Sequence, residues 1–163
     1  MQQFVKPEAL KKGDTVGVIA PSDWFERPDK VRQGVKVLKE WGLKVKLGKY
    51  LFSRVRDFTA GTPTERREDI LGMINDPEVK AIWAAAGGYA ATEVLSVFNK
   101  ETVAKLRVSP KWFIGYSDIC LLLNALSSFR VASIHGPLIE ELTTWDDSTR
   151  EWLRKMLFGE KEM

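Results

Sequence analysis

Apolar residues along this chain follow two alternating patterns. Short runs that are rich in β-branched and aromatic residues, or that alternate with a period of two, are typical of strands. They predict strands at residues 15–20, 43–47, 79–85, 111–115 and 131–135. Longer segments place apolar residues three or four positions apart, as on one face of a helix. They predict helices at residues 28–41, 62–76, 89–98, 100–106, 118–129 and 148–158.

Two of these helices carry further detail. Thr62 is a natural N-cap, with Pro63 at the first helical position and Glu65 at the third, which is the arrangement of a capping box. The last helix is predicted to be amphipathic, with four apolar residues on one face: Trp152, Leu153, Met156 and Leu157. Both helices are therefore expected to pack against the rest of the chain.

The order of the elements predicts the fold class. Strands that alternate with helices and carry continuous apolar runs favour a parallel sheet covered on both faces. We therefore expect one α/β domain over residues 1–163, flavodoxin-like, with a parallel sheet of about five strands and helices on both faces. In such sheets ligands bind beyond the carboxyl ends of the strands.

Composition and charge exclude several classes of function. The 163 residues carry a formal charge of +3, with 25 basic and 22 acidic residues interleaved, which argues against nucleic acid or a membrane as partner. A single cysteine, Cys120, excludes an intramolecular disulfide. No apolar stretch is long enough for a signal peptide or a membrane span, and we expect a cytoplasmic protein. His135 is the only histidine, so no metal and no other cofactor is expected.

Nucleotide binding, the commonest use of this architecture, also lacks its motifs. Neither the Gly-x-x-x-x-Gly-Lys-Ser/Thr loop nor the Gly-x-Gly-x-x-Gly loop occurs. Gly87 and Gly88 end a predicted strand, but no basic residue follows them as a phosphate site would favour.

Four strand ends instead carry small and polar residues: APSD, AAGGYAA, GYSD and HGP. Ser117 lies between a strand and a helix, two residues after Gly115, as in the first half of the Gly-x-Ser-x-Gly elbow that exposes a nucleophile. Ile119 departs from that motif, and a serine that simply caps the helix explains the same residues. Both interpretations are open on local grounds. A nucleophile here would have the Asp118 amide beside it as an oxyanion donor.

The motifs in order resemble one family. The segments LKKGDTVGVIAPS, TAGTPTERREDILGMINDPEVKAIWAAAGGY, PKWFIGYSDI and HGP are similar to the N-terminal half of the serine LD-carboxypeptidases, also called muramoyltetrapeptide carboxypeptidases, and of their microcin-immunity relatives. The resemblance spans nearly the entire chain. It implies hydrolysis, through an acyl-enzyme, of the amide before a C-terminal D-alanine in murein-derived tetrapeptides, without a metal.

The resemblance also implies roles for individual residues. Ser117 is expected to be the catalytic nucleophile, and the amides of Asp118, Gly88 and Gly87 are expected to form the oxyanion hole. Two further residues are expected to bind the substrate, a peptide with a C-terminal D-amino acid: Ser22 and Tyr89.

This sequence departs from the family in two respects. Ala86 and Ala90 flank Gly-Gly-Tyr where the family has arginine and glycine, which removes a cation for a substrate carboxylate. The acid and histidine of the family's Ser–His–Glu triad lie in a C-terminal domain that this chain does not contain, and His135 is not that histidine. We therefore expect the chain to be a fragment of a longer enzyme, inactive alone.

The alternative is a non-catalytic ligand-binding or interaction domain of the same fold. Apolar surface left exposed by the absent domain would allow a homodimer.

Overall fold

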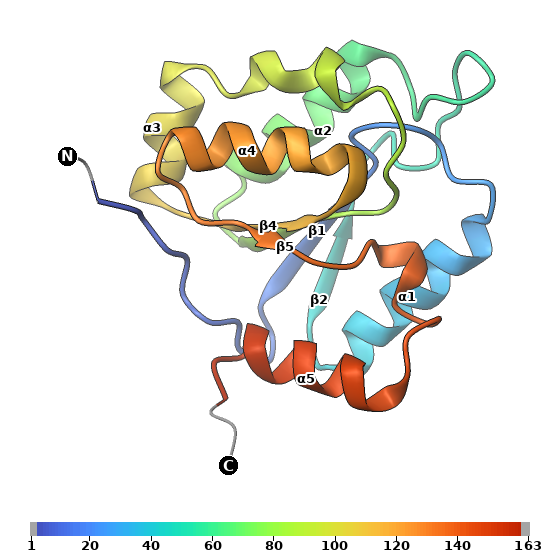
Figure 1. The fold of residues 1–163 in the computed structure, drawn as a ribbon, viewed down its shortest axis with the longest axis vertical. Helices are drawn as coiled ribbons and strands as arrows, with labels where there is room; N and C mark the ends of the chain where they lie inside the picture. The colour runs from blue at the N-terminus through green and yellow to red at the C-terminus, as the bar shows by residue number, and fades with distance from the viewer. Residues whose placement is uncertain (1–2, 161–163) are drawn as a thin grey trace.

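A computed structural model describes residues 3–160 as a five-stranded sheet enclosed by helices (Figure 1). The strand order is β2-β1-β3-β4-β5, and every neighbouring pair is parallel. This is the flavodoxin-like order, in which the chain reverses direction across the sheet between β1 and β3. The predicted α/β class and the parallel sheet are confirmed.

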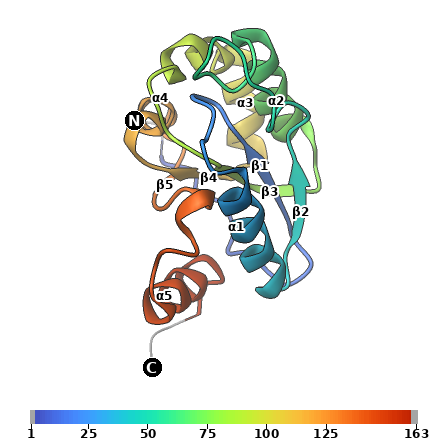
Figure 2. The same ribbon diagram turned by 90° about the vertical axis from the view of Figure 1, so that its right-hand side faces the viewer.

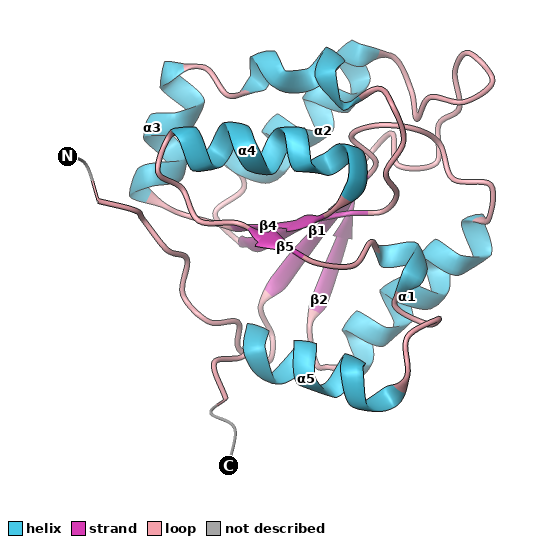
Figure 3. Cartoon of the chain, in the orientation of Figure 1, coloured by secondary structure: helices cyan, strands magenta, loops and turns pink. Residues whose placement is uncertain are grey.

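The strands match the predicted ones closely in place, except the last (Figure 3). They are β1 (Thr15–Ile19), β2 (Lys44–Leu47), β3 (Val79–Ala84), β4 (Trp112–Gly115) and β5 (Ile134–His135). β5 is shorter than the predicted run over residues 131–135, because Val131 forms a separate parallel bridge with Val5. The backbone at Val131 thus pairs with the N-terminal segment instead of extending β5.

Helices account for most of the remaining chain. They are α1 (Pro28–Glu40), α2 (Pro63–Asn75), α3 (Lys100–Val108), α4 (Cys120–Ser128) and α5 (Asp147–Leu157), with 3-10 helices η1 (Ala91–Val97), η2 (Ser117–Ile119) and η3 (Ile139–Glu141). The capping box of α2 is confirmed: Thr62 accepts from the Glu65 amide, and the Glu65 side chain accepts from the Thr62 amide.

Two helix predictions were wrong in detail. The segment predicted as a helix over 89–98 is the 3-10 helix η1, in which the β-branched residues Thr92, Val94 and Val97 lower α-helical propensity. In α5 only Leu153 and Leu157 are buried, whereas Trp152 is 54 % exposed. The face that α5 buries against the rest of the chain therefore consists of Leu153 and Leu157, one turn apart. It is narrower than the predicted face of four residues.

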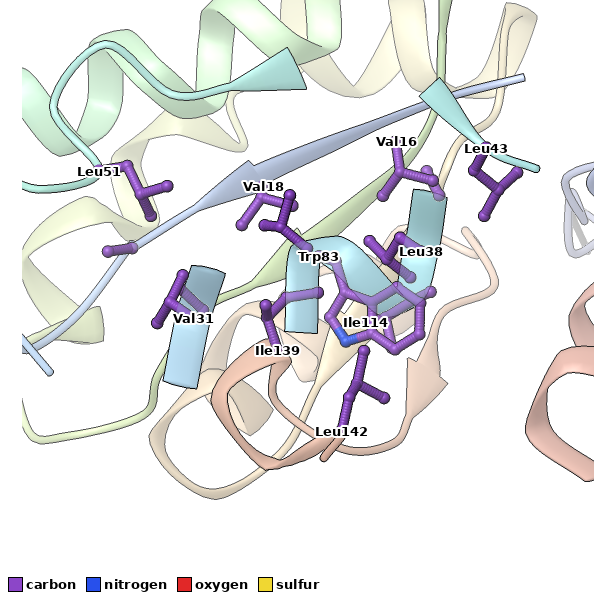
Figure 4. Close-up of a cluster of buried hydrophobic side chains, with 14 of the residues drawn as sticks. Val16, Val18, Val31, Leu38, Leu43, Leu51, Trp83, Ile114, Ile139 and Leu142 are labelled. Carbon is purple, nitrogen blue, oxygen red and sulfur yellow. The ribbon is translucent and has the colours of Figure 1, made fainter. Parts of the chain in front are cut away.

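Alternating strand residues build a separate core on each face of the sheet. Figures 1 and 2 show α2, α3 and α4 on one face and α1 and α5 on the other. On the α1 side, Trp83 is fully buried in a cluster that also contains Val31, Leu38 and Ile139 (Figure 4). Its indole nitrogen donates to the Pro137 carbonyl at 2.6 Å, so this buried polar atom is satisfied.

Gly34 allows α1 and η3 to touch. A Cβ at this position would lie 2.0 Å from the Ile139 carbonyl oxygen, so any other residue would push the two backbones apart. The contact helps to fix where the residues that follow Ile139 lie, together with the bond from the Glu140 amide to the Ala85 carbonyl at 3.2 Å.

Lys111 is a buried cation at the start of β4. Its ammonium donates to the carbonyls of Met73, at 3.1 Å, and of Asp76, where α2 ends. Burial lowers the pKa of Lys111 from its usual value to about 8, with Lys80 and Lys46 acting in the same direction and Asp76 opposing. The side chain therefore caps α2 at the cost of desolvating a charge.

The Gly34 contact predicts an asymmetry between two helical glycines. Gly34→Ala should lower the free energy of unfolding by about 1–3 kcal/mol, because overpacking against Ile139 outweighs the gain in helix propensity. Gly72→Ala is the matched control: Gly72 is exposed in α2 and a Cβ there meets nothing within 4 Å, so stability should rise by up to about 1 kcal/mol. Urea denaturation measures both. Equal effects in the two variants would contradict the contact.

Lys111 predicts a pH dependence of stability. Between its folded pKa of about 8 and its higher unfolded pKa, the unfolded chain binds more protons, so the free energy of unfolding rises with pH. Relative to Lys111→Met, the wild type should gain about 2 kcal/mol between about pH 7.5 and 9.5. Urea denaturation of both proteins across this range tests the prediction, and a constant difference between them would exclude it.

Candidate active site

An open cleft lies at one edge of the sheet, where the strands end. Its volume is about 480 Å³, and it lies at the carboxyl ends of β1, β3 and β4. Its walls include Asp23, Trp24, Ala86, Gly87, Gly88, Tyr116, Ser117, Leu138, Glu140 and Glu141. This is the edge at which flavodoxin-like sheets bind ligands. A second cavity, of about 520 Å³, lies at the opposite edge among Lys6, Lys11 and Pro110.

Ser117 is exposed in the cleft on a strained turn. Its φ angle of +59° lies in the left-handed region, which costs an L-residue roughly 1–2 kcal/mol. Ser117 is the first residue of η2, and the N-cap is Tyr116, which makes no side-chain cap. The interpretation of Ser117 as a simple helix cap is therefore wrong. A sharp strand-to-helix turn with a strained serine at its apex is the geometry of a nucleophile elbow.

Ile119 stands where the elbow motif has its second glycine, and the structure has room for its side chain. Ile119 is buried and packs back toward β4. A Cβ on Gly115 would lie 2.8 Å from Ile119 Cγ2 and 3.3 Å from Ala84 Cβ. Gly115 thus provides the space that the side chain of Ile119 fills.

The Gly87–Gly88 turn lies directly beside the serine. A Cβ on Gly87 would be 3.3 Å from Ser117 Cβ and 3.4 Å from its Oγ, so the bare backbone faces the hydroxyl. Gly88 has a φ angle of +133°, and a Cβ there would overlap the Asp23 carboxylate. Gly88 is therefore required by its close approach to the β1 end, whereas a Cβ at Gly87 would crowd Ser117 without overlapping it.

Ser22 lies beneath the cleft, although it was expected to bind substrate. The side chain is fully buried, with 0 % exposed. Its hydroxyl donates to Asp118 Oδ2 at 2.5 Å and accepts from the Ala90 amide at 3.0 Å. Asp118 Oδ2 also accepts from the Ala91 amide at 2.8 Å. The hydroxyl is occupied by these two bonds, which link three strand ends.

Arg66 supports the same strand ends from α2. It is 1 % exposed, and its Nη1 donates to the carbonyls of Pro21, Ser22 and Ala90 at 3.0–3.4 Å. Its Nη2 pairs with Glu93. Nothing in the sequence marks Arg66 as a buried residue, because it stands in the charged run TERRED, which has the composition of a solvated helix face.

A pair of glutamates forms one wall of the cleft. The Tyr116 hydroxyl donates to Glu141, and this bond raises the pKa of Tyr116 to about 12. Glu141 also accepts from the Leu138 amide at 3.0 Å. Burial and the neighbouring Glu141 raise the pKa of Glu140. Neither glutamate was singled out in the sequence, where they follow the HGP motif as an ordinary charged turn.

Two more residues lie at the edge of the site: Tyr89, which was expected to bind substrate, and His135, the one histidine of the sequence. Tyr89 is 89 % exposed next to the glycine turn. His135 is exposed, and its ring meets that of Tyr116 edge to face, with the centroids 6.0 Å apart.

Within residues 3–160, no group of three or more His, Cys, Asp or Glu side chains is placed to hold a metal ion. No helix in that described range has both the length and the apolar character needed to cross a membrane.

Comparisons with known proteins find relatives of one family. The LD-carboxypeptidase N-terminal domain, Peptidase S66, matches residues 16–136. A probable murein peptide carboxypeptidase of Bacillus subtilis is 39 % identical over 87 % of this chain and 43 % of its own length. The murein tetrapeptide carboxypeptidase of Pseudomonas aeruginosa is 31 % identical over 76 % of this chain and 39 % of its own length.

A solved structure shows the same fold. The crystal structure of an MccF-like protein from Bacillus anthracis is 30 % identical, with a TM-score of 0.81 over 94 % of this chain and 47 % of the other. The chain spans about half the length of the curated relatives it matches. By its sequence and by its fold, the chain belongs to the LD-carboxypeptidase family, Peptidase S66.

Proposed function

We propose that this chain is the nucleophile-bearing domain of a serine-type LD-carboxypeptidase. The observation that carries the proposal is Ser117, exposed in a cleft at the carboxyl edge of the sheet with a φ angle of +59° and the bare backbone of Gly87 beside its hydroxyl. Strain of this kind persists where the surrounding structure enforces it, and it is concentrated at functional sites.

The chemistry follows from the groups around the serine. Ser117 Oγ attacks the carbonyl carbon of the scissile amide, and the carbonyl oxygen becomes an oxyanion. The amides of Asp118 and of the Gly87–Gly88 turn donate to that oxyanion. The tetrahedral intermediate then expels the C-terminal D-amino acid as its amine, which leaves an acyl-enzyme on Ser117. Water hydrolyses this ester and frees the serine.

A base must take the proton from Ser117 and later return a proton to the leaving amine. We propose that a second domain supplies the His and Glu for this role. The relatives support this proposal, because the chain spans about half their length. Without the base, only substrate binding and oxyanion stabilisation remain, and little catalysis is expected.

The proposed substrate is a murein-derived tetrapeptide that ends in D-alanine. The names of two relatives, a murein tetrapeptide carboxypeptidase and a probable murein peptide carboxypeptidase, support this choice. Exposed Tyr89, at the glycine turn, is proposed to contact the peptide.

The place of action is proposed to be the cytoplasm. The homodimer expected from the sequence stays a prediction.

Replacement of the nucleophile tests the function. Ser117→Ala should lower D-alanine release from a murein tetrapeptide by at least about a thousandfold, while the fold is retained. Release is measured for the protein alone, which should show little activity, and after a relative's C-terminal domain is added, where the loss is expected. Ser127→Ala, at an exposed position in α4, is the control and should change nothing. Full activity of Ser117→Ala would exclude the nucleophile assignment. Saturable tetrapeptide binding without hydrolysis in either condition would favour a ligand-binding domain.

The strain at Ser117 predicts a difference between two inactive variants. Ser117→Gly removes the cost of the left-handed backbone, whereas Ser117→Ala keeps it. The free energy of unfolding of Ser117→Gly should therefore exceed that of Ser117→Ala by about 1 kcal/mol. Urea denaturation provides the comparison, and a Gly variant less stable than the Ala variant would contradict the strained elbow.

A further inference from the structure

Ser22 makes two hydrogen bonds that no substrate could share. Its hydroxyl gives its only proton to Asp118 Oδ2 at 2.5 Å and accepts the Ala90 amide at 3.0 Å, and none of the residue is exposed. A group that must donate and accept at once, inside the protein, has to be a hydroxyl or a close equivalent. Alanine would leave a buried amide and a carboxylate oxygen without that partner.

These bonds connect the two backbone segments that flank the nucleophile. Asp118 follows Ser117, and its carboxylate is held by the Ser22 hydroxyl and the Ala91 amide. Ala90 and Ala91 follow the Gly87–Gly88 turn, and their amides bond to Ser22 Oγ and to Asp118 Oδ2 at 2.8 Å. The separation between the Asp118 amide and the glycine amides thus depends on these bonds.

The β1 end is itself held in place on two sides. Arg66 donates to the carbonyls of Ser22 and Ala90 from below the cleft. The Asp23 amide donates to the Gly87 carbonyl at 3.1 Å. Ser22 therefore lies on a short segment that contacts both the glycine turn and the elbow.

We propose that Ser22 is a positioning residue that sets the distance between the two halves of the oxyanion hole without touching the substrate. This inference rests on the proposed function. Oxyanion donors are effective because they are already oriented before the reaction, in a site where reorganisation is costly. Loss of the Ser22 hydroxyl would let the glycine turn move relative to Asp118. The transition state would then lose more than the bound substrate does.

Amide hydrogen exchange by NMR tests the structural half of the proposal on the protein as it stands. Ser22→Ala should speed exchange at Ala90 and Ala91 by about tenfold or more, with Val18 and Ile82 in the central strands unchanged. Ser22→Cys, which keeps a weak donor and acceptor, should give intermediate rates. Ser127→Ala is the control. Unchanged rates at Ala90 and Ala91, or equal acceleration throughout the strands, would overturn the proposal.

The unmodified protein provides a second measurement in case Ser22→Ala does not fold. A buried hydroxyl proton held by a carboxylate exchanges slowly, so Ser22 should show an observable hydroxyl resonance with a cross-peak to the Ala90 amide proton. Rapid exchange of that proton with water would contradict the proposal.

The kinetic part of the proposal is tested by D-alanine release, measured with the added C-terminal domain under conditions in which the wild type is active. Ser22→Ala should lower kcat by about tenfold to a hundredfold and leave KM nearly unchanged, and Ser22→Cys should restore part of kcat. A raised KM with unchanged kcat would instead make Ser22 a substrate-binding residue. If Ser117→Ala is fully active, the proposed function fails. The positioning proposal fails separately if kcat is unchanged in Ser22→Ala while exchange at Ala90 is accelerated.

Discussion

The buried guanidinium of Arg66 is the constraint on which the arrangement of the cleft depends. Loops at the ends of parallel strands leave carbonyl groups that a buried environment must satisfy. Arg66 satisfies carbonyls from the ends of β1 and β3 with one nitrogen, and it pairs its charge with Glu93. A planar donor with fixed geometry also fixes its acceptors. The loops that surround Ser117 are therefore oriented by a side chain that never reaches the cleft.

Much of this fold could be predicted from the sequence, because its elements are locally consistent. The strand runs predicted all five strands, and the Thr62–Glu65 box marked the start of α2 correctly. The prediction failed where tertiary contacts decide. Val131 left β5 to pair with Val5, which no local pattern indicates. Trp152 and Met156 of α5 lie on the exposed side, because hydrophobic spacing shows which residues share a face and not how wide the contact is.

The site was only partly predictable for the same reason. The strand–Ser–helix pattern located Ser117, but neither its positive φ angle nor the close packing of Gly115 against Ile119 can be read from that pattern. Charged residues were the harder cases. Arg66 and Lys111 are almost completely buried, and in the sequence they are indistinguishable from solvated lysines and arginines. Burial of a cation depends on carbonyl acceptors that come together only after folding, so composition cannot reveal it.

The bridge between Val5 and Val131 has a consequence for solubility. β5 is an edge strand of only two residues, and the N-terminal segment pairs with the backbone just before it, through bonds between Val5 and both Arg130 and Ala132. An uncovered edge is a template for strands of other molecules. The segment around Val5 thus covers the backbone beside this edge strand, and its loss would expose an unpaired edge of the sheet on which other chains can aggregate.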